Sequence, residues 1–203
     1  MKLYYSPGAC SMIVRMVLHQ VGESFEATQI DLSVGEQRSS SFLSINPKGK
    51  VPTVVRDDGS ILTELGTILT WIAERHPDSG LMPREHDQAL RTREAVEYCI
   101  STIHALATTR IFVPSSFGSV AEEEAIRAEG RQRLTDGLAI LNEQFAAGDH
   151  FTGRLTIADF MIFWLALGAL MSGLQLPSAV QRGYEAMMQL DSVTRALAEE
   201  GFA

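Results

Sequence analysis

The sequence contains only two cysteines, Cys10 and Cys99, among its 203 residues. A disulfide-stabilised secreted fold needs more cysteines than this, so the scarcity argues against such a framework and favours a reducing compartment. No secretory signal precedes the first predicted strand, and we therefore expect a cytoplasmic protein.

Positive charge is scarce as well. The chain has 17 Lys and Arg against 25 Asp and Glu, which gives a formal net charge of -8 at pH 7. Nucleic acids and anionic membranes bind through basic patches, so neither is an expected partner. No pair of histidines has the spacing of metal ligands, and no phosphate-binding or dinucleotide-binding glycine pattern is present. We expect no metal and no nucleotide cofactor.

No apolar run is long enough to cross a membrane. Residues 160–181 carry no charge, but the densest part, 160–176, contains Gly168, Ser172 and Gly173. It is also shorter than the roughly 20 apolar residues that a bilayer span needs. This segment predicts a helix buried inside a helical domain.

The chain divides into an α/β half and an all-α half. Apolar patterning and turn residues predict four strands and two helices in the order β-α-β, loop, β-β-α, at residues 2–5, 10–21, 25–32, 51–55, 61–63 and 64–76. Beyond residue 85 only amphipathic helices are predicted, at residues 85–110, 121–146, 156–171, 178–188 and 192–200. We expect one domain over residues 1–77, a linker over 78–84 and an all-α domain over 85–203.

Cys10 and Ser11 stand where the first strand turns into the first helix. The free N–H groups and the dipole at a helix start stabilise anions. A thiolate is such an anion, whether it belongs to Cys10 or to a bound ligand. The plainer alternative is that Cys10 is a small residue at a helix start without a role.

Two further segments allow either a structural or a binding role. The residues alone favour a trans bond at Val51-Pro52, because cis is the minority form. A cis bond would instead turn the backbone groups of Val51 outward to pair with an extended, peptide-like ligand. Glu64 begins a helix and can cap it, or it can accept the ammonium of an amino-acid ligand whose carboxylate binds the helix N–H groups.

In the helical half, Thr156 and Asp159 form a predicted capping box with a purely structural role. His104 and Ser101 lie three residues apart and share a helix face, although a lone helical histidine is more often structural. Cys99 is predicted to be a packed core thiol. The remaining histidines are predicted to face solvent: His19, His76, His86 and His150.

Four motifs occur in order along the chain: YSPGACS at residues 5–11, NPKGKVP at 46–52, TE at 63–64 and TIAD at 156–159. Together they resemble the cytosolic glutathione transferases over essentially the whole chain. With Cys10 at the first turn and His104 on the long helix, the sequence is most similar to the bacterial beta class. This resemblance implies a thioredoxin-like β-α-β-β-β-α domain, a C-terminal all-helical domain and a homodimer in which the partner's long helix lines the cleft.

The resemblance also implies a glutathione site. Val51 and a cis Pro52 would hold the cysteinyl part, while Glu64 and the backbone N–H of Leu65 would hold the γ-glutamyl end. Glutathione-binding positions that complete this set are Ala9, Ser101 and, for the glycyl carboxylate, Lys50, Gln37 or Arg38. The catalytic positions are Cys10, beside the glutathione sulfur, with Ser11, His104 and Tyr5, of which Tyr5 is ranked below Cys10.

Four departures from the family pattern concern this site. Leu65 stands where serine or a small residue is common, Glu97 where the class often has asparagine, and Ala105 where lysine is common. Residues 33–38 also lack the lysine that usually meets the glycyl carboxylate. These departures predict weaker glutathione binding.

The resemblance implies a glutathione S-transferase whose thiolate attacks a hydrophobic electrophile. Thiol–disulfide exchange through Cys10 is the competing chemistry. It would involve a single thiol of the protein, because the sequence has no C-x-x-C pair. A non-catalytic ligand-binding or protein-interaction module is the alternative of a different class. The electrophile subsite is expected to be flat and apolar, around Pro7, Met12, Phe112 and Phe117.

Overall fold

The computed structural model describes residues 1–202, which divide into two compact units. The first unit comprises Met1–Ser79 together with the C-terminal segment from Gln189, and the second comprises Gly80–Met188. The predicted change from α/β to all-α near residue 80 is therefore present. The C-terminal segment differs from the prediction, because it packs with the first unit and not with the helices that precede it. Among the described residues, no helix is long and apolar enough to cross a membrane.

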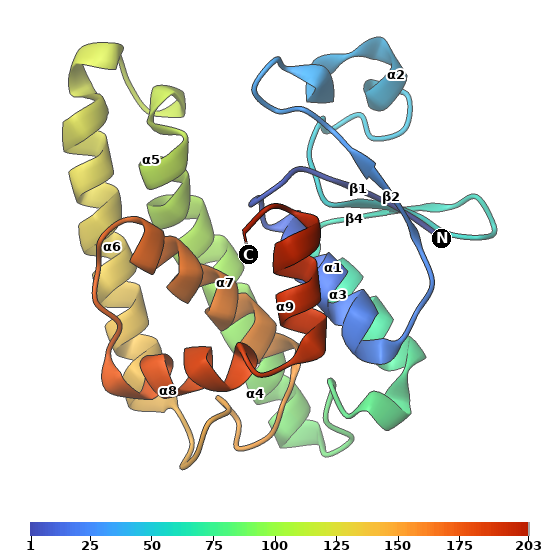
Figure 1. The fold of residues 1–203 in the computed structure, drawn as a ribbon, viewed down its shortest axis with the longest axis vertical. Helices are drawn as coiled ribbons and strands as arrows, with labels where there is room; N and C mark the ends of the chain where they lie inside the picture. The colour runs from blue at the N-terminus through green and yellow to red at the C-terminus, as the bar shows by residue number, and fades with distance from the viewer. Residues whose placement is uncertain (203) are drawn as a thin grey trace. The chain divides into compact units, whose positions relative to one another are not determined.

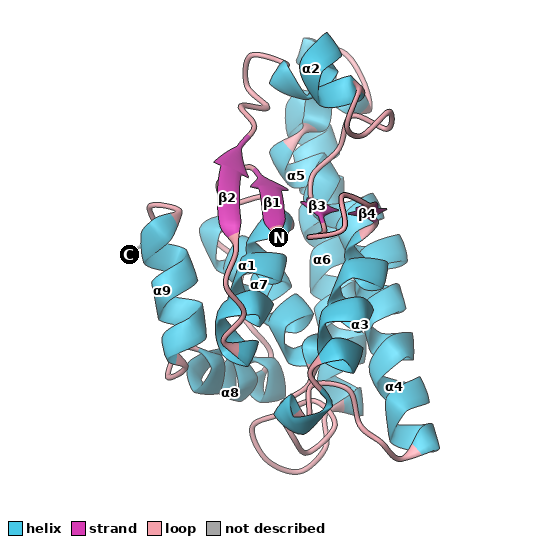
Figure 2. Ribbon diagram, turned by 90° about the vertical axis from the view of Figure 1, so that its right-hand side faces the viewer, coloured by secondary structure: helices cyan, strands magenta, loops and turns pink. Residues whose placement is uncertain are grey.

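The first unit is built on a four-stranded sheet with the order β2-β1-β3-β4 (Figure 2). Its strands are β1 (Lys2–Tyr5), β2 (Glu26–Gln29), β3 (Thr53–Val55) and β4 (Ile61–Thr63). β1 runs parallel to β2 and antiparallel to β3, and β3 pairs antiparallel with β4. The β3 strand begins two residues later than predicted, since Pro52 has no N–H to donate to a ladder.

Helices α1 (Ser11–Val21) and α3 (Leu65–Arg75) pack side by side against the sheet, and α9 (Asp191–Glu199) packs along α1 (Figure 1). The apolar residues of α1 are buried as their spacing predicts, from Met12 to Leu18. Short helical turns complete the unit: η1 (Glu36–Arg38), α2 (Ser40–Leu43) and η2 (Pro77–Ser79).

The second unit is helical. The predicted long helix over 85–110 is one continuous helical segment, but its middle differs from the prediction. It consists of α4 (His86–Glu97), the π-helix η3 (Tyr98–Thr108) and α5 (Thr109–Phe112). The remaining elements are η4 (Pro114–Ser116), η5 (Val120–Glu122), α6 (Glu123–Gln144), α7 (Ile157–Met171) and α8 (Ser178–Met187).

Helix α7 is the buried centre of the second unit, as its uncharged sequence predicts. The predicted capping box at its start is confirmed. The backbone N–H and hydroxyl of Thr156 both donate to the Asp159 carboxylate, at 2.8 and 3.0 Å. The other oxygen of Asp159 accepts from the N–H of Phe151 at 2.8 Å, so this carboxylate also fastens the loop before α7.

Candidate functional site

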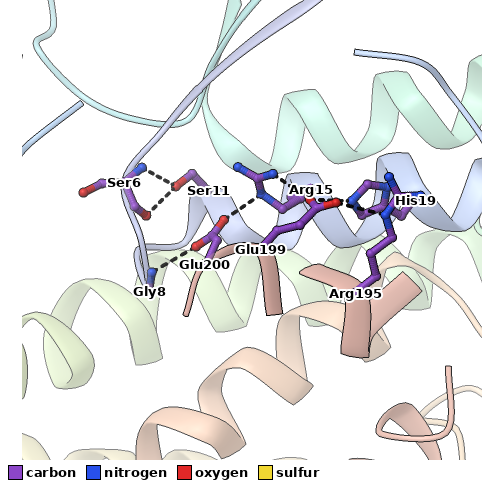
Figure 3. A network of polar contacts seen from close by, with 8 residues as sticks. All are labelled: Ser6, Gly8, Ser11, Arg15, His19, Arg195, Glu199 and Glu200. Atoms are coloured by element: carbon purple, nitrogen blue, oxygen red, sulfur yellow. Dashed lines mark hydrogen bonds and ion pairs between the residues drawn. The ribbon is translucent and has the colours of Figure 1, made fainter. Parts of the chain in front are cut away.

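The turn between β1 and α1 is closed by Ser11. Its fully buried hydroxyl accepts from the N–H of Ser6 at 3.1 Å and donates to the Ser6 carbonyl at 3.2 Å (Figure 3). The hydroxyl proton of Ser11 is therefore donated to an acceptor within the protein. Its two hydrogen bonds to the backbone of Ser6 hold the turn in shape.

Cys10 lies at the start of α1, with its thiol 3.9 Å from the carbonyl oxygen of Val51, to which it donates. Burial raises the pKa of the Cys10 thiol to about 12, although its own backbone N–H and the charge of Lys50 act in the opposite direction. The helix start favours a thiolate on Cys10 or on a bound ligand, and for Cys10 itself the loss of water around the sulfur outweighs the favourable field. At neutral pH this cysteine is a hydrogen-bond donor.

The bond between Val51 and Pro52 is cis. The trans bond favoured by the residues alone is therefore wrong, and the cis proline implied by the family resemblance is present. Buried Asn46 braces this loop, because its side-chain amide donates to the carbonyl of Lys50 and to the hydroxyl of Thr53, both at 2.8 Å. The Val51 carbonyl is thereby held facing Cys10.

Glu64 has a backbone φ of 71°, which makes it the one non-glycine residue with positive φ among residues 1–202. Its side chain makes no capping hydrogen bond to α3. Instead, the exposed carboxylate accepts from the ammonium of Lys48 at 2.5 Å, and the same ammonium donates to the hydroxyl of Thr63 at 2.9 Å. Strained backbone of this kind is concentrated at functional sites. Because the Glu64 side chain makes no hydrogen bond to the N-terminus of α3, the capping role considered for it is wrong.

Lys48, the cation that pairs with Glu64, is not singled out by the sequence analysis. It lies within the NPKGKVP motif, two residues before the predicted site residue Lys50. The opposite charges of Lys48 and Glu64 were the sequence signal for this pair, since an exposed carboxylate at a helix start attracts a nearby cation.

The other predicted positions of the first unit have distinct surroundings. The ring of Tyr5 lies 4.1 Å from the guanidinium of Arg15, which stacks over it. The side chain of Leu65 is buried, so the backbone N–H is what it can offer a ligand. Ala9 is partly exposed in the turn.

The loop that carries Gln37 and Arg38 packs tightly on Gly49. A Cβ at Gly49, where φ is +60°, would lie 2.8 Å from the Gln37 carbonyl oxygen and 3.0 Å from the Arg38 guanidinium. Within the described chain, the buried side-chain oxygen of Gln37 has no hydrogen-bond partner. Arg38 and Lys50 are exposed. The structure thus brings these candidates to one loop cluster.

The second unit carries the two predicted positions of the long helix. In η3, the His104 ring nitrogen Nδ1 lies 2.7 Å from the Thr108 hydroxyl, and the ring packs edge-on against Trp164 at 5.0 Å. Ser101 is exposed and its hydroxyl donates to the Glu97 carbonyl at 2.8 Å. Cys99 is buried, as predicted, and burial raises its pKa.

Two expectations about individual side chains are wrong. Met12 is fully buried in the core of the first unit and lines no subsite, whereas Phe112 and Phe117 are exposed. His19 does not face solvent, because its ring nitrogen Nε2 lies 2.9 Å from the carboxylate of Glu199 and only 8 % of its side chain is exposed. Among residues 1–202, no group of His, Cys, Asp and Glu could hold a metal ion.

The four-stranded sheet, the cysteine at the start of α1 and the cis Val51-Pro52 bond, whose Val51 carbonyl faces that cysteine, define a protein of the thioredoxin-like class, here with a helical second unit. Comparison with known proteins agrees with this class. The family model described as the N-terminal domain of glutathione S-transferase matches residues 8–75. Glutathione S-transferase GstA of Escherichia coli O157:H7 is 30% identical to the chain, over 99% of both proteins. The chain therefore belongs to the glutathione S-transferase family, a family of transferases.

Solved structures and a further relative extend the comparison. A sphingomonad glutathione S-transferase complexed with glutathione is 31% identical and superposes with a TM-score of 0.85 over 100% of both chains. A bacterial beta-class enzyme from Sphingomonas chungbukensis is 29% identical, with a TM-score of 0.84 over 100% of both chains. A zeta-class glutathione S-transferase of Euphorbia esula is 34% identical over 80% of this chain and 72% of that protein. Both classes are thus represented among the relatives.

Proposed function

We propose that this protein is a beta-class-like glutathione transferase that activates the thiol of bound glutathione and not its own. The observation that carries the proposal is the state of Cys10, whose burial raises its pKa to about 12 while its sulfur faces the Val51 carbonyl. A protonated Cys10 is a poor nucleophile but can donate a hydrogen bond to a thiolate beside it. Glutathione as the ligand is supported by family membership and by the relatives solved with it.

The turn and the cis proline provide a place for the cysteinyl part of glutathione. The backbone of Val51 pairs with the ligand as an added strand would, and Ala9 lies in the opposite turn. The N-terminus of α1 then favours the ionised form of the ligand's thiol. Nucleophilic attack follows: the thiolate sulfur forms a bond to an electrophilic carbon, whose leaving group departs with the bonding electron pair.

Glu64 and α3 provide the site for the γ-glutamyl end. The ligand's ammonium binds the Glu64 carboxylate, where the Lys48 ammonium lies in the present structure. The ligand's carboxylate binds the N-terminal N–H groups of α3, beginning with that of Leu65. Lys50, Gln37 and Arg38 are the candidates for the glycyl carboxylate.

Tyr5 completes the proposed site in the first unit. The roles of His104 and Ser101 in the second unit stay predictions from the family resemblance, and the electrophile is a hydrophobic small molecule. The protein works as a cytoplasmic homodimer in this proposal. Thiol–disulfide exchange through Cys10 is the less favoured chemistry, because its thiol is protonated at neutral pH.

A pH titration of thiolate absorbance, with and without glutathione, tests the proposal in wild type, Cys10→Ser and the matched control Cys99→Ser. We expect a glutathione-dependent signal with a pKa below that of free glutathione, present in all three proteins. Loss of the signal in Cys10→Ser alone would place the reactive thiolate on Cys10 and favour exchange. Absence of any glutathione-dependent signal would favour the non-catalytic binding module.

A further inference from the structure

The C-terminal segment of the chain reaches the Cys10 turn through Glu200. One carboxylate oxygen of Glu200 accepts from the backbone N–H of Gly8 at 3.0 Å, and the other accepts from Arg15 Nε at 2.9 Å (Figure 3). The Glu200 side chain is completely buried and that of Arg15 is 5 % exposed. A single buried carboxylate therefore joins the backbone of the turn to helix α1.

Two other contacts converge on the same turn. The ring of Phe202 covers Gly8, since a Cβ at that glycine would lie 2.7 Å from the ring, and the Gly8 backbone has a φ of +73°. The Arg15 guanidinium that binds Glu200 also stacks over the ring of Tyr5, at the end of β1. The strand end, the turn and the helix start are thus all tied to residues 200–202.

Glu199 provides a natural contrast. Its carboxylate accepts from Arg15 Nη1 at 2.8 Å and from Arg195 Nε at 2.9 Å, and it lies 2.9 Å from His19 Nε2. These partners belong to α1 and α9 alone, and about a third of the Glu199 side chain is exposed. Glu199 therefore docks α9 on α1 without contacting the turn, whereas Glu200 does both.

We infer that Glu200 is a positioning residue for the thiol site. It fixes the Gly8 backbone and so sets the position of Cys10 two residues later. Turns on a protein surface are ordinarily mobile, and a charge-assisted hydrogen bond to a buried carboxylate is one of the stronger restraints available. The catalytic meaning of this restraint rests on the proposed glutathione transferase function, but the restraint itself does not.

The experiment compares Glu200→Ala with Glu199→Ala, which removes the adjacent carboxylate. The rate of iodoacetamide alkylation is measured at Cys10 by peptide mass spectrometry without glutathione, with Cys99 as an internal reference for general opening. We expect alkylation of Cys10 to rise about tenfold in Glu200→Ala and to change less than about twofold in Glu199→Ala. Glu200→Gln, which can keep only one of the two hydrogen bonds, guards against a misfolded alanine variant and should give a smaller rise than Glu200→Ala.

Steady-state kinetics provide the second readout. We expect Glu200→Ala to raise KM for glutathione about tenfold and Glu199→Ala to leave it within about twofold. The inference would be overturned if the two alanine variants changed the alkylation rate of Cys10 equally, or if the alkylation rate of Cys99 rose as much as that of Cys10. It would also be overturned if the alkylation rate of Cys10 were unchanged in both Glu200→Ala and Glu200→Gln. If the alkylation result holds while no variant or wild type turns over glutathione, the proposed function fails and the positioning role stands.

Discussion

The ammonium of Lys48 lies 2.5 Å from the Glu64 carboxylate, at the position where the proposed ligand would place its own ammonium. Both side chains are more than half exposed, so the pair itself contributes little to stability. The same carboxylate in contact with a ligand would be partly shielded from water and would bind more strongly.

Substitutions of Glu64 and Lys48 should therefore change the affinity for glutathione in opposite directions. Glu64→Gln should weaken glutathione binding about tenfold, because it removes the charge that receives the ligand's ammonium. Lys48→Met should strengthen binding about twofold, because it removes the competing cation of a weak exposed pair. Isothermal titration with glutathione measures both, and a loss of affinity in Lys48→Met would show that the lysine itself binds the ligand.

Ser11 is the second test of the site. Ser11→Ala removes both hydrogen bonds that close the turn and leaves the buried N–H and carbonyl of Ser6 without their partner. We expect the free energy of unfolding to fall by about 2 kcal/mol. The exposed Ser44, whose hydroxyl donates to the Ser41 carbonyl, is the matched control, and Ser44→Ala should cost less than about 0.5 kcal/mol.

Urea denaturation gives both values for the two serine variants. A thiolate-donor role for Ser11 makes the contrary prediction: Ser11→Ala would keep its stability and lose kcat. The structure favours the first outcome because the hydroxyl is fully buried and already has an acceptor.

The fold could be read from the sequence because its elements have clear periodicity and punctuation. The apolar spacing of residues 13–21 predicts α1, and the hairpin signal at residues 57–59 predicts β3 and β4. The capping box at Thr156 could be predicted in atomic detail, since its partners are three residues apart. Local rules are sufficient wherever the interacting groups are neighbours in the chain.

Features that depend on distant partners could not be read in this way. The amphipathic pattern of α9 predicts an apolar face but not the helix it will cover, and His19 gives no sign of a carboxylate 180 residues away. The surroundings of the Cys10 thiol could not be predicted for the same reason. A helix start is visible in the sequence, whereas the burial that raises the pKa of the Cys10 thiol and the contact of its sulfur with the Val51 carbonyl 41 residues away are not.

Asp159 is the third test, and it concerns stability alone. Its carboxylate accepts hydrogen bonds from Phe151 and Thr156 while almost fully buried, so Asp159→Ala leaves several buried donors unsatisfied. We expect a loss of about 3 kcal/mol in the free energy of unfolding, against less than about 0.5 kcal/mol for the exposed neighbour in Asp149→Ala. Urea denaturation checks this, and similar losses in the two variants would contradict the role given to the capping box.

The same carboxylate acts on His150. The Asp159 carboxylate lies 3.6 Å from His150 Nδ1 and raises the pKa of this imidazole, despite the opposing effect of its partial burial. In Asp159→Asn, which keeps the shape and removes the charge, the pKa of His150 should move down toward its ordinary value. NMR titration of the ring protons measures the shift, and an unchanged pKa would assign the effect to another group.

Glu199 and Glu200 should give stability profiles with opposite dependence on pH. Burial acts to raise the pKa of Glu199, but hydrogen bonds from His19, Arg15 and Arg195 outweigh it and lower the pKa from 4.5 to about 2. A carboxyl whose pKa is lower in the folded state contributes stability above pH 4.5 and loses that contribution as the pH falls toward 2. After allowance for solvent screening, Glu199→Gln should cost about 1 kcal/mol at pH 6, with the difference from wild type vanishing near pH 2.

The pKa of Glu200 is raised, because burial outweighs its bonds to Gly8 and Arg15. The contribution of Glu200 to stability therefore depends on pH in the opposite direction. A group whose pKa is raised in the folded state stabilises the fold at low pH and does so less as the pH increases. The difference in stability between wild type and Glu200→Gln should therefore narrow as the pH rises, whereas the difference for Glu199→Gln should widen. Urea denaturation between pH 3 and 7 follows both differences in parallel. Slopes of the same sign would mean that the two adjacent carboxylates titrate as one pair, and the separate roles assigned to docking α9 and to holding the turn would then have to be merged.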